Sequence, residues 1–213
     1  MARSERSFVP AAGADWLLPF YDPLLRLFGG DAARGELIEQ AKLQPGLRAL
    51  DIGCGTGSLV VLAQRLHPKL ELVGLDPDPK ALTRAQRKVE RAGASVQLDR
   101  GFSNEIPHPD ASFDRVFSSF MFHHLSPDAK RATLNEVRRV LRPSGSLHLL
   151  DFGGGDHGLH SWLARVSHSH ENMHDNLEGR LLELLAEAGF VEPCEVAQRR
   201  TLFGRIAWYR AGV

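Results

Sequence analysis

The chain has 213 residues, of which 43% are hydrophobic and 24% are charged, and its formal net charge is zero. This length predicts a single domain with a sizeable core, and the neutral charge gives no indication of a nucleic-acid partner. The two cysteines lack metal-site spacing and exclude a disulfide framework, which indicates a reducing compartment. The first residues lack the apolar run of a secretory signal, and no stretch reaches the ~18 apolar residues of a membrane span. We therefore expect a cytoplasmic protein without stable membrane insertion.

The first 45 residues differ in pattern from the rest of the chain. Residues 14–30 are apolar but are broken by two prolines, which predicts two short helical pieces. Asp31 is placed to cap a further helix over residues 32–43. We expect residues 1–45 to form a helical lid and residues 46–213 to form the main domain.

From residue 46 onward, strand-like and helix-like segments alternate. The predicted strands cover residues 47–52, 70–76, 95–100, 113–119 and 146–152. The predicted helices between them cover residues 57–66, 79–92 and 127–141. Such alternation is typical of a parallel sheet with helices on both faces.

The last quarter of the chain breaks this alternation. Residues 153–178 are expected to be a substrate-covering insertion, and a helix is predicted over residues 176–188. Two successive strand-like segments, 190–198 and 201–210, must then pair as a hairpin. The sequence thus predicts an α/β fold, a Rossmann-like doubly wound seven-stranded sheet that is mostly parallel, with an antiparallel C-terminal strand.

A glycine-rich loop follows the first predicted strand. Asp51 ends that strand, and Gly53, Gly55 and Gly57 alternate after it in the segment LDIGCGTG. Glycines at this place let the backbone approach a ligand closely. The spacing is one residue away from a dinucleotide fingerprint, so a nicotinamide cofactor competes with S-adenosylmethionine (SAM). A carboxylate beside the loop repels a pyrophosphate but suits the ammonium and sulfonium of SAM, while spare N–H groups of the loop can bind the methionine carboxylate.

A second acid lies at the end of the next predicted strand. Asp76, in the segment VGLDPDP, is placed to accept hydrogen bonds from both ribose hydroxyls of either cofactor. Asp78 and Pro79 are expected to begin the following helix. The charge pattern of the two strand ends together favours SAM.

Four blocks of sequence carry a resemblance to a known family. They are LDIGCGTGS, VGLDPDP, IPHPDASFDRVFSSFMFHHL and EVRRVLRPSGSLHLLDF, and they cover roughly residues 47–152. In this order they resemble the class I SAM-dependent methyltransferases, in the branch that includes the ubiquinone and menaquinone biosynthesis enzymes. The resemblance implies methyl transfer from SAM to a small molecule.

The resemblance also implies which residues hold the cofactor. The glycines line its methionine end with Ser118, Asp76 holds the ribose, and Tyr21 covers the cofactor or instead packs beside Phe20. Where the family has Gly-Asp-Ala near the adenine, this chain has Gly-Phe-Ser, so Phe102 can stack on the ring and Ser103 can hydrogen-bond to it. The expected cofactor-binding residues are Tyr21, Asp51, Gly53, Cys54, Gly55, Gly57, Asp76, Pro77, Phe102, Ser103 and Ser118.

Two groups of histidines are candidates for chemistry. His123 and His124 follow the fourth strand on the cofactor side, and either can act as a general base; the alternative is that one caps the turn and the other packs. Residues 157–174 contain five more histidines, for which a polar lid is expected rather than a metal site, because the strong zinc motifs are missing.

The acceptor itself is predicted only by class. Phe120, Met121 and Phe122 near the site indicate a small apolar or aromatic molecule that is methylated on oxygen or nitrogen, with carbon as a further alternative. Two other functions compete: a nicotinamide-dependent oxidoreductase, and a non-catalytic protein that binds SAM or responds to metal. We expect a monomer or a homodimer.

Overall fold

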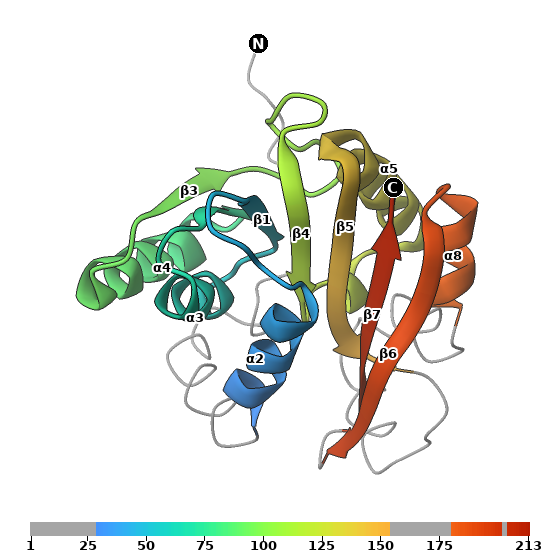
Figure 1. Ribbon diagram of the computed structural model, residues 1–213, viewed down its shortest axis with the longest axis horizontal. Coiled ribbons are helices and arrows are strands. Elements are labelled where there is room, and N and C mark those ends of the chain that lie inside the picture. Colours follow the sequence, from blue (N-terminus) through green and yellow to red (C-terminus); the bar gives the residue numbers. More distant parts are fainter. Residues whose placement is uncertain (1–28, 154–179, 202–203) are drawn as a thin grey trace.

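A seven-stranded sheet lies at the centre of the molecule, with helices on both faces (Figure 1). The computed structural model describes residues 29–153, 180–201 and 204–213. The strand order is β3-β2-β1-β4-β5-β7-β6, in which β7 runs antiparallel to both of its neighbours and the first five strands are parallel. The strands are β1 (Arg48–Ile52), β2 (Glu71–Asp76), β3 (Val96–Arg100), β4 (Phe113–Ser119), β5 (Leu141–Phe152), β6 (Val191–Thr201) and β7 (Gly204–Gly212).

The helices divide into two layers. On one face lie α2 (Gly30–Gln40), α3 (Ser58–Leu66) and α4 (Pro79–Ala92); on the other lie α5 (Pro127–Val140) and α8 (Leu181–Glu187), and the short 3-10 helix η2 (Phe122–His124) precedes α5. Each layer encloses a separate hydrophobic cluster. Side chains of α2 and α3 pack with Phe117 and Trp208 on one face, whereas those of α5 and α8 pack with Phe113 and Val116 on the other.

The predicted fold class is confirmed by this sheet, including the antiparallel hairpin at its end. The helix over residues 79–92 and the strand over residues 113–119 begin and end where the sequence predicts. Local chemistry explains the helix, because the Asp78 carboxylate accepts the N–H of Lys80 at 2.8 Å and Pro79 occupies the first turn.

The fifth strand begins earlier than predicted. A turn was expected to precede residue 146, but β5 starts at Leu141, which pairs with Phe113. The ladder resumes at the pair Arg115–Ser146, so the intervening residues form an irregularity in which Ser144 has a φ of 66°. The turn-forming residues are accommodated inside the strand as a bulge.

The carboxyl ends of β1, β2, β4 and β5 lie at one edge of the sheet, because these strands are parallel neighbours; β4 and β5 run towards the bottom in Figure 1. Register places Ile52 between Leu75 of β2 and Ser118 of β4. Residues that follow these strand ends are therefore brought together, although they are far apart in the sequence. Ligands of open α/β sheets bind at this kind of edge.

The predicted lid and insertion are described only in part. Within residues 1–45, α2 packs on the sheet through Leu37 and Ile38, which are fully buried. Residues 1–28 and 154–179, and with them Tyr21 and the histidines of residues 157–174, lie outside the described residues. In the part of the chain that the structure covers, no helix is long and apolar enough to cross a membrane.

Candidate active site

The glycine loop after β1 has a backbone that only glycine fits well. Gly53 has a φ of 67° and Gly57 a φ of 77°, both in the left-handed region. A Cβ at Gly53 would lie 2.2 Å from Cγ of Met121, so the Met121 side chain packs directly over this glycine. The loop glycines thus serve both the turn and the close approach of a neighbouring segment.

The N–H groups of this loop are largely engaged by the protein itself. Those of Gly53 and Cys54 both donate to the carbonyl of Leu75, at 2.8 and 3.0 Å. The N–H of Gly55 donates to Oδ2 of Asp76 at 2.8 Å, and that of Gly57 donates to the carbonyl of Cys54 at 2.9 Å. The loop is therefore braced against the end of β2.

Asp51 is the most unusual side chain at this edge. It is 1% exposed, and neither carboxylate oxygen has a hydrogen-bond partner among the described residues. Burial raises its pKa to about 8, Arg34 opposes this rise, and the charge of Asp76 adds to it. A buried, unpartnered carboxylate is costly and calls for a cationic partner, and the ammonium of SAM fits that requirement.

Ser118 and Asp76 lie near the ends of the two strands on either side of β1. The Ser118 hydroxyl is fully buried and also lacks a partner among the described residues. Asp76 accepts the N–H of Gly55 on Oδ2 and that of Asp78 on Oδ1, at 2.8 and 2.9 Å. Burial raises its pKa, while these two hydrogen bonds oppose the rise. Each oxygen retains a lone pair for a ribose hydroxyl.

Cys54 and Pro77 lie beside this group. The Cys54 thiol is buried and lies close to Gly74, where an added Cβ would be 3.0 Å from its Sγ. Burial first, and the charges of Asp51 and Asp76 after it, raise its pKa well above the usual value, so it stays a neutral thiol. Pro77 accepts a hydrogen bond from Nε of Arg100 through its carbonyl.

The residues expected at the adenine end follow β3 and contact other parts of the protein. The Ser103 hydroxyl is 2.9 Å from the hydroxyl of the buried Thr133 on α5. Phe102 forms an isolated bridge with Glu105 and is half-buried. Asp99 lies 3.1 Å from Nε2 of His108. Asp99, Phe102 and Ser103 are all partly exposed.

The pair of histidines lies on η2, where His123 contacts the carboxylate of Asp151. Nδ1 of the His123 ring is 2.5 Å from Oδ1 of Asp151, and the backbone N–H of His123 donates to Oδ2 of Asp151 at 3.0 Å. Burial alone would raise the pKa of Asp151, which is fully buried, but the charge and hydrogen bonds of His123 and the N–H of Phe152 hold it below its usual value. Burial and the adjacent His123 lower the pKa of His124 to about 3, so His124 is neutral.

Aromatic side chains surround this histidine pair. The ring of Phe152 lies 5.0 Å from that of His123 and 5.7 Å from that of Phe120. Phe120 has a φ of 54°, which is strained for a non-glycine residue. This sharp turn after β4 directs Met121 over Gly53 and brings η2 to Asp151.

The structure thus gathers most of the expected site residues at one edge. Asp51, Asp76 and Ser118 lie within the last two residues of β1, β2 and β4, and Gly53 and His123 follow β1 and β4. The described residues contain no group of three or more potential ligands that could hold a metal ion.

Two residues at this edge were missed by the sequence analysis. Asp151 is a charged residue inside an otherwise apolar strand, and Arg34 lies three and four residues before Leu37 and Ile38, on the apolar face of its helix. A charge at a position that periodicity assigns to the core was the signal that both residues offered.

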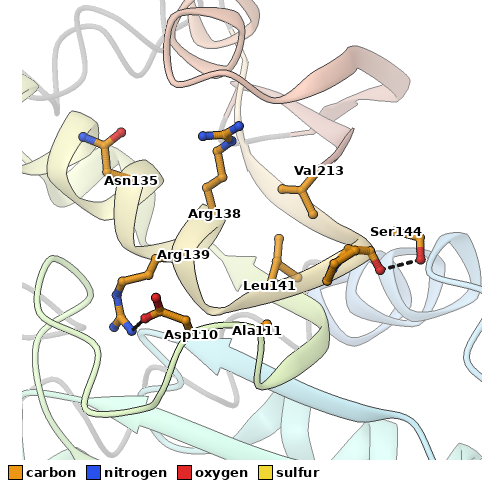
Figure 2. A pocket seen from close by; sticks show the side chains of 9 residues that line it. Asp110, Ala111, Asn135, Arg138, Arg139, Leu141, Ser144 and Val213 are labelled. Atoms are coloured by element: carbon orange, nitrogen blue, oxygen red, sulfur yellow. Dashed lines mark hydrogen bonds and ion pairs between the residues drawn. The ribbon is translucent and has the colours of Figure 1, made fainter.

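A cavity of about 610 Å³ lies at the opposite edge of the sheet (Figure 2). It is lined by residues from the ends of α5 and the beginning of β5, including Arg138, Leu141 and Ser144. Arg139 points at Asp110 across it and forms an ion pair at 2.7 Å. None of the expected site residues within the described part of the chain lines this cavity, so we assign it no part in cofactor binding.

Comparison with known proteins agrees with the geometry. Residues 49–145 match a family described as a methyltransferase domain. The chain is 35% identical over 153 residues to a demethylmenaquinone methyltransferase of Thermus thermophilus, an alignment that covers 70% of this chain and 69% of that protein. It is 32% identical over 157 residues to the enzyme of the same name from Deinococcus radiodurans, covering 72% of this chain and 64% of that protein. The chain therefore spans about two thirds of the length of these relatives.

A solved structure shares the fold at lower sequence identity. Phosphoethanolamine N-methyltransferase 2 of Haemonchus contortus, in complex with SAM, matches with a TM-score of 0.79 at 18% identity, over 99% of this chain and 60% of that chain. This likeness concerns the fold alone. Together with the Thermus relative and the matched methyltransferase domain, however, the arrangement of β1, its glycine loop and Asp76 decides between the two competing cofactors. The chain belongs to the class I SAM-dependent methyltransferases.

Proposed function

We propose that this methyltransferase acts on a small hydroxylated aromatic molecule, on the hydroxyl oxygen or on a ring carbon activated by it. The observation that carries the proposal is the pair formed by His123 and the buried Asp151, beside the rings of Phe120 and Phe152. A base with an oriented imidazole serves an acceptor that must lose a proton, and the aromatic side chains suit an aromatic acceptor.

In this proposal His123 is the catalytic base. Its Nδ1 is engaged by Asp151, which leaves Nε2 as the nitrogen that accepts the proton of the acceptor hydroxyl. Asp151 acts as a positioning residue: it fixes the tautomer and stabilises the imidazolium that forms. His124 is neutral and packs at a ring distance of 4.0 Å from His123, so it has a supporting role.

SAM supplies a methyl group on a positively charged sulfur, which is lost as a neutral thioether. His123 would take up the hydroxyl proton of the acceptor as the methyl group passes from the sulfur to the acceptor oxygen or carbon. The residues at the sheet edge contribute alignment and exclusion of water. Asp51, Gly53, Asp76 and Ser118 are the residues expected to hold the cofactor.

The names of the relatives suggest the first acceptor to test. The Thermus and Deinococcus proteins are named demethylmenaquinone methyltransferases, and a reduced demethylated naphthoquinone has the hydroxylated aromatic ring that the proposal requires. Amines are the principal alternative acceptors.

The proposal is tested in two steps. Calorimetry should detect binding of S-adenosylhomocysteine, and labelled SAM should then transfer its methyl group to members of a panel of reduced naphthoquinones, phenols and amines. Transfer to a quinol or phenol supports the proposal, whereas transfer to amines alone contradicts it. Cofactor binding without transfer to any acceptor would favour a non-catalytic SAM-binding protein instead.

A further inference from the structure

A buried arginine near the cofactor loop makes only long contacts with other described side chains. Arg34, in the middle of α2, is 5% exposed. Its Nε lies 3.4 Å from the Ser119 hydroxyl and its Nη1 lies 3.5 Å from Oδ1 of Asp31, both at the limit of a hydrogen bond. The ring of Phe120 is 5.8 Å away. A guanidinium has five N–H donors, and a buried one is usually paired closely with an anion.

The natural anion for this arginine does not pair with it. Asp51 and Arg34 are near enough that Arg34 lowers the pKa of the carboxyl. Among the described residues, however, Asp51 has no hydrogen bond, and no ion pair joins the two side chains. Arg34 contacts Ser119 at the carboxyl end of β4, which is the neighbour of β1, so a buried acid and a buried cation lie near the same strand ends without contacting each other. This arrangement is complementary to a zwitterion whose two charged groups fit between them.

The glycine loop offers few donors for an anionic ligand. The N–H groups of Gly53, Cys54, Gly55 and Gly57 all donate to acceptors of the protein. Backbone capture of the methionine carboxylate, which the sequence favours, would have to rely on the remaining loop positions. A carboxylate at this edge is better served by a charged side chain with a planar fork of donors.

We propose that Arg34 binds the α-carboxylate of the methionine moiety of SAM, while Asp51 binds its α-ammonium. This inference rests on the proposed use of the sheet edge for SAM and adds a residue from α2 to it. In this arrangement the amino-acid end of the cofactor neutralises both buried charges, so that the two side chains select a zwitterion over a ligand that lacks either group.

Two ligands separate the two charges experimentally. S-adenosylhomocysteine carries both groups, whereas the aminopropyl thioether of adenosine is the same molecule without its carboxylate. Calorimetry with purified Arg34→Gln protein should show the dissociation constant of S-adenosylhomocysteine rising about 30-fold or more, with that of the aminopropyl thioether little changed. Arg48→Gln is the matched control, because Arg48 stacks on Phe113 at the opposite end of β1 and should alter neither constant.

The outcomes distinguish the failure of this inference from the failure of the proposed function. Equal losses for both ligands, or an unchanged constant for S-adenosylhomocysteine, would overturn the role of Arg34 while leaving a SAM site. Failure of the unmodified protein to bind either ligand would overturn the cofactor assignment itself. Should Arg34→Gln fail to fold, Arg34→Lys keeps the positive charge but loses the planar pair of guanidinium donors. It is expected to weaken the binding of S-adenosylhomocysteine more than that of the aminopropyl thioether.

Discussion

Asp51 has opposite effects on the free protein and on the cofactor complex. Its folded-state pKa of about 8 lies far above the reference value of 3.8. The folded state therefore holds its proton more tightly than the unfolded state, so its contribution to stability is complete below about pH 4. That contribution is lost as the pH rises to about 8. Binding of the SAM ammonium beside Asp51 offsets the free-energy cost of ionising this buried carboxyl.

Asp51→Asn is accordingly expected to stabilise the ligand-free protein. The gain should be about 1–3 kcal/mol at pH 8, the cost of an unsatisfied buried polar group, and clearly smaller at pH 5. Thermal unfolding at the two pH values measures it. Asp128→Asn, at a fully exposed position of α5, is the control and should shift the thermal midpoint by the same amount at both pH values. A gain that does not depend on pH would mean that Asp51 is ionised in the free protein throughout this range.

The affinity for S-adenosylhomocysteine should increase between pH 6 and pH 8. The ammonium binds to ionised Asp51. Below the Asp51 pKa of about 8 the carboxyl of the free protein is protonated, so binding requires release of that proton. The charges that face this carboxyl are those of Arg34 and Asp76. Calorimetry in two buffers of different ionisation enthalpy should detect the released proton, and Asp51→Asn should remove both the release and the pH dependence.

The His123–Asp151 pair should affect turnover rather than cofactor binding. His123→Gln is expected to lower kcat by about 100-fold or more, and Asp151→Asn should lower it comparably because the imidazole loses its fixed tautomer. KM and the dissociation constant of S-adenosylhomocysteine should remain nearly unchanged. His148→Gln, which removes another buried histidine of the same sheet, serves as the control. Unchanged kcat in His123→Gln would eliminate this histidine as the base.

At the scale of elements, the glycine loop and the segment after β4 are fitted to each other. The Met121 side chain occupies the space that a Cβ of Gly53 would need, and the positive φ of Phe120 turns the chain so that Met121 lies there. Two segments 68 residues apart in sequence, residues 53 and 121, therefore determine the shape of the methionine end. A substitution in either segment should therefore alter the packing of the other.

Gly53→Ala tests this fit, with Gly93→Ala as its matched control. Both glycines have a left-handed φ, of 67° and 61°, but an added Cβ at Gly93 meets nothing within 4 Å. Gly93→Ala should cost only the backbone strain of about 1–2 kcal/mol, whereas Gly53→Ala should cost more and should also weaken S-adenosylhomocysteine binding. Adding Met121→Ala to Gly53→Ala should restore part of the stability, as measured by denaturant unfolding.

At the scale of the whole molecule, the site joins both hydrophobic clusters. Asp51 lies near the end of β1 and Gly53 just after it, and Ala49 and Leu50 of the same strand face opposite clusters. Asp151 lies near the end of β5, after the buried residues Leu149 and Leu150. A ligand held between these strand ends stabilises the cooperative unit by mass action. S-adenosylhomocysteine at about 100 times its dissociation constant should add about 2.7 kcal/mol to the free energy of unfolding.

This stabilisation is measured as an increase in the thermal midpoint, by about 2–4 °C for each kcal/mol at this chain length. The increase should grow with the logarithm of ligand concentration. Arg48→Gln should keep the increase and Arg34→Gln should lose most of it. A midpoint that stays constant as S-adenosylhomocysteine is added would contradict binding to the folded state.

Much of the fold could be predicted from local patterns. The alternation of apolar strands with amphipathic helices predicted the parallel sheet, and the succession of two strands predicted its antiparallel hairpin, because these features depend on neighbours in the chain. The start of β5 was wrong by several residues, since the proline and glycine of residues 142–145 indicate a turn while pairing with Phe113 extends the strand across it. Pairing with a distant strand is not visible in a local window.

The sequence by itself determined that a nucleotide-containing cofactor binds after the first two strands and favoured SAM over a nicotinamide cofactor, because Asp51, the alternating glycines and Asp76 are close together in the chain. Only the tertiary structure decided which side chains meet across the sheet. Asp151 reaches His123 and Arg34 comes near Asp51 because β5 and α2 pack beside β4 and β1. The physical reason is burial. The interactions and pKa values of Asp51, Arg34 and Asp151 depend on their removal from water in the folded state, and the partner that each side chain then faces cannot be predicted from the local sequence.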